Sequence, residues 1–278
     1  LASDLKIDPQ YLNDIPDLKP SQNDVAVYNS SFARMPESEK TELKAIFAER
    51  GKLVQKHHAD KKELLRLKYQ WYMQDYMACV ASIDENVGRL LNYLDSTGLS
   101  KNTIVMYTGD QGFYLGENGW FDKRWMYDVS MQAPLLMRWP GKIKAGSINS
   151  DQVQNIDFAP TMLDIAETAI PDWMQGISLK KQLLSNTPLQ REYLYYHYYE
   201  YPIDHYVAPH LGVRSKNFKL VYFYTHNEWE FYDLKKDPTE QKNLIKSTAH
   251  AKEIARYKTI LNQLRDQYDD HEVAGELK

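Results

Sequence analysis

Residues 103–126 read TIVMYTGDQGFYLGENGWFDKRWM. The segment opens with an unbroken apolar run at residues 104–107, which is typical of a parallel strand buried on both faces. Directly after this run comes a G-D-Q-G turn at residues 109–112. A strand therefore brings Asp110 to its own carboxyl edge, which is where open α/β sheets bind their ligands.

Asp110 and Gln111 place a carboxylate and an amide carbonyl side by side. Two hard oxygen donors suit a calcium-like or magnesium-like cation and do not suit zinc, which prefers His and Cys. An ordinary turn is the simpler interpretation, because Asp and Gly dominate turns for conformational reasons. A second cluster argues for a site: Asp122, Lys123 and Arg124 stand in a row between Trp120-Phe121 and Trp125-Met126. Such surroundings favour a pocket for an anionic, ring-shaped ligand over a surface cluster of salt bridges.

The run YTGDQGFYLGENGWFDKRWMYD at residues 107–128, followed by APLLMRWPG at residues 133–141, closely resembles the C-terminal half of a type I sulfatase. The nearest resemblance is to the glucosamine-6-sulfatase and heparan sulfatase-like branch. It extends from about Tyr69 to the last predicted helix and joins several motifs in the same order. The resemblance implies an α/β fold: the C-terminal part of an alkaline phosphatase-like α/β sandwich, followed by a small antiparallel sheet-plus-helix subdomain.

By this resemblance, Asp110 and Gln111 are ligands of Ca²⁺, with Mg²⁺ the less favoured ion. The same resemblance makes Lys123 the catalytic residue that contacts a sulfate oxygen, where an ammonium offsets the charge that develops on sulfate and leaving oxygen. It also implies that Asp122 and Arg124 bind sugar hydroxyls, since a carboxylate and a guanidinium can each hold one or two of them.

His210 lies between predicted strands of the C-terminal subdomain, where related sugar sulfatases have a histidine that reaches the substrate. The resemblance therefore makes His210 a further substrate-binding residue, and the alternative is a solvated loop histidine. The chain departs from its bacterial relatives at Asn118, where they usually have His, and at Asp128, where they usually have Glu. These departures leave the fine substrate preference open.

The single cysteine, Cys79, does not satisfy the nucleophile motif of this family. Type I sulfatases oxidise the cysteine of C-x-(P/A)-x-R to formylglycine, whose hydrate attacks sulfur, whereas this chain reads CVASI at residues 79–83. Ile83 stands where the arginine belongs, and Cys79 falls deep inside a long helix predicted for residues 60–95. We therefore expect Cys79 to be a small buried hydrophobe. We expect the formylglycine upstream of this chain, in an N-terminal half of the same enzyme.

Two domains are predicted. Residues 1–185 form the C-terminal part of the sulfatase α/β domain, beginning with an irregular, proline-broken region over residues 1–59 that has only short helical turns. Residues 186–278 form a small α+β subdomain. The predicted elements after the long helix are a strand at 134–139, a helix at 157–166 begun by Asp157, strands at 193–201, 212–225 and 229–234, and a helix at 254–268.

Composition narrows the function. With 278 residues, 43% hydrophobic and 26% charged, the chain has the make-up of a soluble globular protein. A net charge of −4 and the lack of a basic stripe argue against nucleic acid as a partner. No segment reaches the run of about 18 apolar residues that a membrane span needs. The 21 Tyr and 6 Trp offer the flat amphipathic surfaces that carbohydrates require, although a Tyr-rich sheet interface explains them equally.

Three functions fit these residues. The first is part of a periplasmic or secreted sulfatase, lysosomal in a eukaryote, that removes 6-O-sulfate from N-acetylglucosamine or glucosamine in heparan-type glycans. Its partner is then a sulfated sugar or glycosaminoglycan oligosaccharide, and this chain alone is inactive. The second is a phosphate-ester hydrolase of the alkaline phosphatase superfamily, although Gln111 stands where the zinc enzymes of that group use His. The third is a non-catalytic carbohydrate-binding piece.

Overall fold

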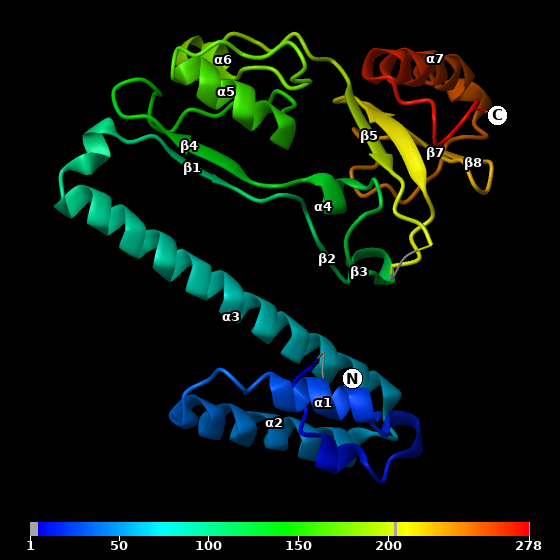
Figure 1. The fold of residues 1–278 in the computed structure, drawn as a ribbon. Helices are drawn as coiled ribbons and strands as arrows, with labels where there is room; N and C mark the ends of the chain where they lie inside the picture. Colours follow the sequence, from blue (N-terminus) through cyan, green and yellow to red (C-terminus); the bar gives the residue numbers. More distant parts are fainter. Residues whose placement is uncertain (1–4, 203–204, 278) are drawn as a thin grey trace. The chain divides into compact units, whose positions relative to one another are not determined.

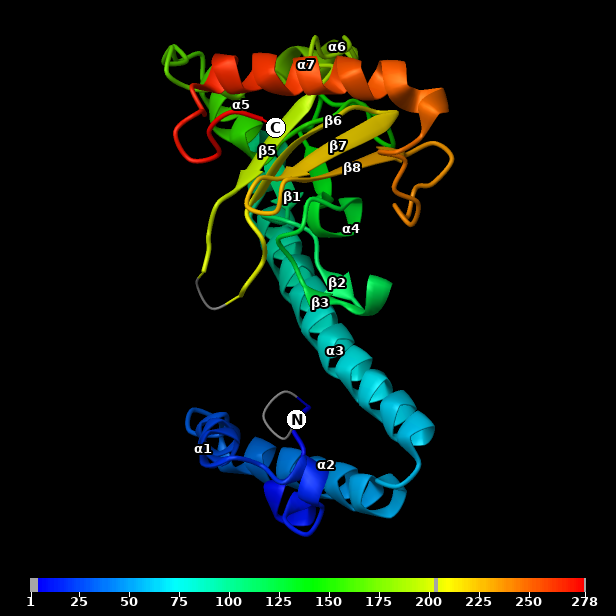
Figure 2. The same cartoon turned by 90° about the vertical axis from the view of Figure 1, so that its right-hand side faces the viewer.

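The computed structural model describes residues 5–202 and 205–277, which form two compact units, Leu1–Thr97 and Gly98–Lys278 (Figures 1 and 2). Each unit has hydrophobic core clusters of its own. The predicted division between residues 185 and 186 lies inside the second unit and stays a prediction.

The first unit is helical. Its elements are α1 (Gln22–Ser30), α2 (Glu37–His57) and α3 (Lys61–Ser96), preceded by 3-10 turns at Pro9–Leu12 and Pro16–Leu18. The predicted helix at residues 60–95 is confirmed as α3. Its start is fixed by Asp60, whose carboxylate accepts hydrogen bonds from the amides of Lys62 and Glu63 and so satisfies donors that lack an intrahelical partner.

The prediction that residues 1–59 are largely irregular is wrong, because α1 and α2 occupy much of this region. The prolines stand where helical turns begin. Pro9 and Pro16 lie in the first turn of their 3-10 turns, and Pro36 is the N-cap of α2. Proline is accepted at a helix start because the amide that it lacks has no intrahelical acceptor there.

A partly buried ion pair also hides the helical pattern of α2. Arg50 is 7% exposed, and its guanidinium donates to both carboxylate oxygens of Asp75 in α3, at 2.8 and 2.6 Å, and to the Leu5 carbonyl at 2.8 Å. A charged residue therefore takes an inward position that a hydrophobic pattern counts as polar. The stripe that α2 buries consists of Phe47, Arg50, Gly51 and Val54.

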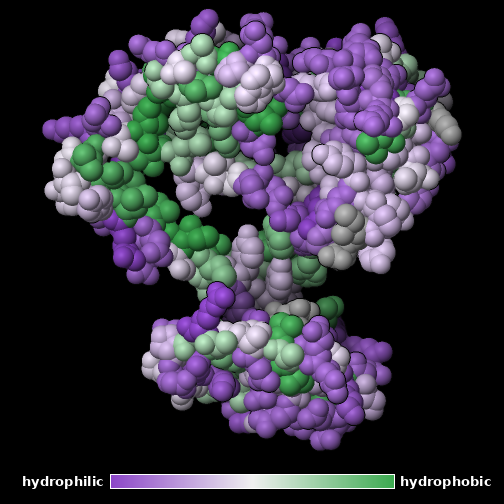
Figure 3. All heavy atoms as spheres, in the orientation of Figure 1, coloured by the Kyte–Doolittle hydropathy of each residue, from purple (hydrophilic) through white to green (hydrophobic). Residues whose placement is uncertain are grey.

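The prediction that Cys79 is buried is wrong, since its side chain is exposed on α3. The apolar residues nearby are exposed too, Val80 by 41% and Ile83 by 50%, and Figure 3 shows hydrophobic surface along the C-terminal half of α3. The apolar periodicity identified the helix correctly. The periodicity does not show which protein surface, if any, covers the apolar stripe of the helix.

The second unit contains the predicted strand at residues 104–107 as β1 (Val105–Thr108) and the next one as β4 (Leu135–Arg138). The two strands are antiparallel, with Val105 opposite Arg138. The parallel, doubly buried strand expected from the apolar run is therefore not what this pair shows, and Tyr107 and Leu136 are 41% and 60% exposed. An apolar run carries no information on strand direction, because direction depends on which segment pairs with it.

Shorter elements connect β1 to the C-terminal sheet. They are β2 (Tyr114–Leu115), β3 (Phe121–Asp122), α4 (Asp128–Met131), α5 (Phe158–Ile165) and α6 (Lys180–Ser185), with 3-10 turns at Leu99–Asn102, Glu117–Gly119 and Asn155–Asp157. Asp157 precedes α5 as predicted, but its carboxylate does not cap that helix. It accepts two hydrogen bonds of 2.6 Å from Arg191 instead, and so ties the start of α5 to the segment that leads into the C-terminal sheet.

The C-terminal sheet is antiparallel, in the order β5 (Leu194–Tyr198), β6 (His210–Arg214), β7 (Phe218–Phe223) and β8 (Glu228–Asp233). The single predicted segment at residues 212–225 is two strands, β6 and β7. Helix α7 (Ala251–Tyr268) lies along one face, as predicted (Figures 1 and 2). The opposite face packs Val221 and Phe223 against Met126, so the loop after β3 is held on the sheet.

Candidate functional site

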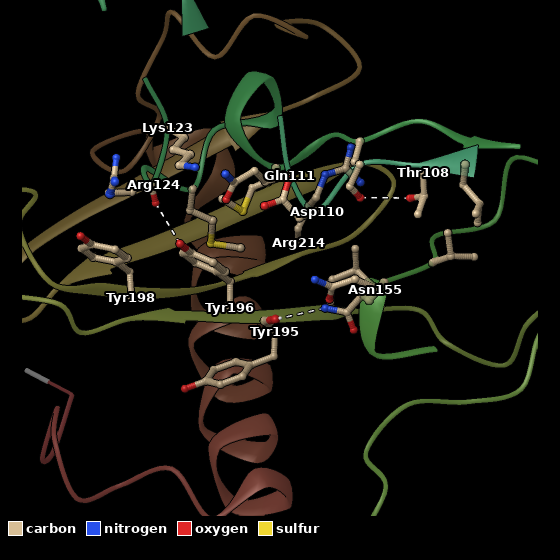
Figure 4. Close-up of a pocket in the computed structure, with 18 of the residues that line it drawn as sticks. Thr108, Asp110, Gln111, Lys123, Arg124, Asn155, Tyr195, Tyr196, Tyr198 and Arg214 are labelled. Carbon is tan, nitrogen blue, oxygen red and sulfur yellow. Dashed lines mark hydrogen bonds between the residues drawn. The ribbon is translucent and has the colours of Figure 1, made fainter. Parts of the chain in front are cut away.

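A cavity of about 530 Å³ lies in the second unit, where the carboxyl end of β1, the loop after β3 and strand β5 meet (Figure 4). The side chains that carry its chemistry are Asp110, Gln111, Lys123, Arg124, Tyr196 and Tyr198. Three segments that are far apart in the sequence thus contribute polar groups to one space.

The turn after β1 is shaped by close backbone packing. A Cβ atom at Gly112 would come within 2.0 Å of the Val129 carbonyl oxygen, and the Gly112 amide donates to the Ser130 carbonyl at 2.8 Å. Only glycine fits this approach. With Gly112 locked against α4, Asp110 and Gln111 line the cavity (Figure 4).

Lys123 comes from the loop after β3 and lines the same cavity. Figure 4 shows Lys123, Gln111 and Asp110 along one rim, with Tyr196 and Tyr198 below them. Within residues 5–202 and 205–277 the Lys123 ammonium has no hydrogen-bonding or ion-pair partner, so it is available to an anionic ligand. The structure thus brings together the three residues that the sequence predicted for the cation and the sulfate, while their roles stay predictions.

Asp122 and Arg124 form a polar cluster at the cavity with a histidine that the sequence analysis did not choose. The Arg124 guanidinium donates to the Asp122 carboxylate and to Nε2 of His205, the latter at 2.6 Å. Glu200 lies 4.0 Å from the same guanidinium. Asp122 and Arg124, both predicted to bind sugar hydroxyls, therefore lie in contact, and His205 lies beside them.

His210 is placed differently. Its side chain has no exposed surface, its Nδ1–H donates to the Ala208 carbonyl at 2.8 Å, and its Nε2 accepts from the Met126 amide at 3.1 Å. Burial lowers the pKa of His210 to about 4, which keeps the ring neutral. A direct bond to substrate would require one of these bonds to break, so the geometry does not support the predicted substrate contact.

The aromatic residues beside the charged triplet pack on one another and do not line the cavity. Trp120 stacks on Trp125 with ring centroids 5.1 Å apart, and Trp125 stacks on His210 at 5.6 Å. The aromatic lining comes instead from Phe158, Tyr195, Tyr196 and Tyr198, which sequence analysis missed as site residues. Three of these four stand in the Tyr-rich run at 193–201, which therefore carried a usable signal.

Two family profiles match the chain. The Sulfatase profile matches residues 20–168, and the profile for N-sulphoglucosamine sulphohydrolase, C-terminal, matches residues 116–267. Each covers more than half of the 278 residues. The chain belongs to the sulfatase family. Its predicted fold class, an alkaline phosphatase-like α/β architecture with a small antiparallel sheet and helix, is confirmed by the solved structures described below.

Relatives of this sulfatase chain include the N-acetylglucosamine-6-O-sulfatase of Bacteroides thetaiotaomicron, 45% identical over 87% of this chain and 44% of the relative. The arylsulfatase of Clostridium perfringens is 31% identical over 73% of this chain and 40% of its own length. The chain thus spans less than half of either relative.

Solved structures agree with this placement of the sulfatase chain. The structure of BT4656 in complex with its substrate D-glucosamine-2-N,6-O-disulfate has a TM-score of 0.86 at 39% identity, over 98% of this chain and 60% of that one. The phosphonate monoester hydrolase SpPMH from Silicibacter pomeroyi has a TM-score of 0.67 at 26% identity, over 74% of this chain and 43% of that one.

In the part of this sulfatase chain that the structure describes, no helix combines the length and apolar character that crossing a membrane demands. Among the same residues, no three His, Cys, Asp or Glu side chains gather in a metal-binding cluster. Asp110 and Gln111 offer one carboxylate and one amide carbonyl, which are hard oxygen donors. Two such residues supply fewer oxygen ligands than the six to eight that Ca²⁺ takes.

Proposed function

We propose that this chain forms part of a sulfuric ester hydrolase that removes 6-O-sulfate from N-acetylglucosamine or glucosamine units of heparan-type glycans. The observation that carries the proposal is the ammonium of Lys123, which has no partner among the described residues, in the cavity that Asp110 and Gln111 also line. An anionic group held there meets the Lys123 ammonium and, along the same rim, oxygen donors for a bound cation. Support for the sugar comes from two relatives, whose names specify N-acetylglucosamine 6-O-sulfate and a glucosamine 2-N,6-O-disulfate.

In this proposal Lys123 is the catalytic residue that contacts a sulfate oxygen. Breaking the S–O bond leaves negative charge on the sulfate and on the leaving oxygen, and a preorganised ammonium stabilises that charge more than it stabilises the ground state. Lys123 needs no rearrangement to do so, since no carboxylate of the described residues holds it.

Asp110 and Gln111 would supply two ligands of a bound Ca²⁺, with Mg²⁺ the less favoured ion. Oxygen donors alone suit these hard cations, and Gln111 in place of His disfavours zinc. The remaining ligands would come from residues outside this chain. When bound, the cation adds positive charge next to the sulfate.

Asp122, Arg124 and His205 are proposed to orient the sugar. A carboxylate, a guanidinium fork and an imidazole in one cluster can bind neighbouring hydroxyl groups from different directions. His205 takes the role that sequence analysis assigned to His210, because His205 lies at the Arg124 guanidinium.

The nucleophile is proposed to lie outside these 278 residues, as a formylglycine in an N-terminal part of the same enzyme. Cys79 does not fit that role, since Ile83 stands at the arginine position of the motif and Cys79 lies within α3. The relatives, more than twice as long as the matched region, leave room for such a part. A periplasmic or secreted location is proposed on the sulfatase family alone.

A phosphate-ester or phosphonate-ester hydrolase is the second candidate, and the likeness to a phosphonate monoester hydrolase favours it. Hydrolysis of a sulfate ester and hydrolysis of a phosphate or phosphonate ester both need a pocket that binds an oxyanion with the help of a cation. The cavity with Lys123, Asp110 and Gln111 suits either substrate. Comparing hydrolysis of glucosamine 6-sulfate with that of glucosamine 6-phosphate separates the two. A preference for the phosphate ester overturns the sulfatase assignment.

The test of the proposed function is Lys123→Ala in the full-length enzyme. Loss of the ammonium is expected to lower kcat for 6-O-sulfated N-acetylglucosamine by ~100-fold or more, with an unchanged melting temperature, because no described residue depends on Lys123 for a bond. Steady-state sulfate release and thermal melting measure the two quantities. The matched control is Lys142→Ala, an exposed lysine outside the cavity. Turnover by Lys123→Ala equal to that of the control removes Lys123 from the site.

A further inference from the structure

Two residues of the charged triplet have a backbone conformation that is unfavourable for their side chains. Asp122 has a φ of +85° and Arg124 a φ of +95°, in the left-handed half of the Ramachandran plot that L residues rarely occupy. Such strain persists only where surrounding structure imposes it, and it clusters at functional sites. Something in the second unit must therefore hold this loop.

Side chains from two other elements bind the polar backbone atoms of Arg124. Its amide donates to Ser130 Oγ at 2.8 Å, and its carbonyl accepts from the Tyr196 hydroxyl at 3.0 Å (Figure 4). Ser130 is fully buried in α4, and Tyr196 lies on β5 at the cavity wall. Burial raises the pKa of Tyr196 to about 12, so its hydroxyl stays a donor.

A third anchor follows two residues later. The Met126 amide donates to Nε2 of His210, and the ring is itself fixed by its bond to the Ala208 carbonyl and by stacking on Trp125. The Met126 side chain rests on β6 at Gly212, where an added Cβ would come within 2.5 Å of the Met126 sulfur. Both the backbone and the side chain of Met126 are thus held by the sheet.

We propose that Ser130, Tyr196 and His210 are positioning residues that hold the loop from Asp122 to Met126 in its strained conformation. Each binds a backbone atom of the loop, and none competes for the side chain of Lys123. Their effect is to set the direction in which the Lys123 and Arg124 side chains leave the backbone. The catalytic consequence rests on the proposed function, whereas the effect on the loop itself does not.

Tyr196→Phe is the sharpest variant, because it removes one hydroxyl and keeps the ring. In the full-length enzyme we expect kcat/KM for 6-O-sulfated N-acetylglucosamine to fall ~10- to 100-fold, since small displacements of a catalytic group are costly. Hydrogen exchange followed by mass spectrometry should show faster exchange of the amides of Arg124 and Met126. The control is Tyr193→Phe, whose hydroxyl bonds only to Glu192 and Arg256 at the surface.

A second background separates positioning from direct contact with substrate. Glycine adopts a positive φ without strain, so an Arg124→Gly loop needs less restraint. The loss caused by Tyr196→Phe is expected to shrink to about twofold or less in the Arg124→Gly enzyme. An equal loss in both backgrounds means that Tyr196 acts on the substrate directly and overturns the proposal.

The exchange measurement keeps this proposal separate from the proposed function. If the wild-type enzyme releases no sulfate, the proposed function fails, and faster exchange in Tyr196→Phe still supports the positioning role. Unchanged exchange and unchanged kcat/KM in Tyr196→Phe contradict the positioning role even in an active sulfatase. Ser130→Ala, which removes the other bond to Arg124, is expected to give the same pattern in both measurements.

Discussion

His210 is a histidine whose chemistry is decided by what covers it. Both ring nitrogens are bonded inside the protein, and aromatic rings of Trp125, Tyr196 and Phe223 surround it. A charged imidazolium there would lose hydration, and its Nε2 would lose the Met126 amide as a partner. Burial accordingly lowers the pKa of His210 from 6.5 to about 4.

This lowered pKa makes a prediction for stability. Between pH 6.5 and pH 4 the unfolded chain binds a proton at this histidine and the folded chain does not, so the free energy of unfolding rises with pH in that window. The contribution is complete above pH 6.5 and is lost as the pH falls toward 4, by at most about 3 kcal/mol. In His210→Gln the dependence, followed by urea unfolding from pH 4.5 to 7, should be shallower than in wild type. The exposed His226→Gln is the control, and parallel wild-type and His210→Gln curves contradict the prediction.

At the scale of single residues, sequence analysis predicted the cavity residues whose position follows from a local sequence motif. Asp110, Gln111 and Lys123 follow directly from the end of a strand and from the charged triplet, and they line one cavity. The choice between His205 and His210 could not be made from the sequence. Both stand in the same segment, and only the pairing of β5, β6 and β7 decides which ring is buried.

Helix α4 and strands β6 and β7 are joined by a network of ion pairs in which acidic and basic side chains alternate. Asp128 accepts from Arg214 at 2.8 and 2.6 Å and from Lys219 at 2.7 Å, and Lys219 lies 2.6 Å from Glu240. Burial alone would raise the pKa of Asp128, but the hydrogen bonds from Arg214 and Lys219 outweigh it and lower that pKa to about 2. These ion pairs fix α4, which directly follows the loop from Asp122 to Met126.

Lys219 is at the centre of this network of ion pairs, and its side chain is 0% exposed. Lys219→Met is expected to lower the free energy of unfolding by roughly 3–5 kcal/mol, because the buried Glu240 carboxylate then loses its ammonium partner, while Asp128 keeps Arg214. Chemical denaturation measures this loss. Adding Glu240→Gln should restore part of it by removing one of the carboxylates. Lys236→Met, which removes an exposed lysine 3.4 Å from the Asp233 carboxylate, should cost under about 1 kcal/mol. Equal effects at Lys219 and Lys236 would contradict a structural role for the network.

At the scale of elements, periodicity and capping predicted the helices and strands whose formation depends on residues close together in the sequence. Helix α3 and the strands β5 and β8 were found because their patterns are regular. Helix α2 was missed because Arg50 takes an inward position, and the direction of β1 was missed because it depends on β4, about 30 residues away. Partners that are distant in the sequence, and charges that pair in the interior, leave no local pattern to read.

At the scale of the whole molecule, the proposed function gives the cavity part of what sulfate ester hydrolysis requires. It has the ammonium of Lys123, two oxygen donors for a cation in Asp110 and Gln111, and a polar cluster around Arg124. The nucleophile is proposed to lie outside these residues, because Ile83 stands at the arginine position of the family motif and Cys79 lies within α3. Binding groups and bond-breaking groups are thus expected on different parts of the full-length enzyme.

It follows that the 278 residues by themselves should release no sulfate from 6-O-sulfated N-acetylglucosamine, with or without added Ca²⁺. Positioning and electrostatic groups lower a barrier only when a nucleophile is present to attack the sulfur. Sulfate release by the isolated chain, with its folding checked by circular dichroism, should be compared with release by the full-length enzyme at equal concentration. Turnover by the isolated chain that disappears in Lys123→Ala would show that these residues contain their own nucleophile, and the proposed division of the active site would then be wrong.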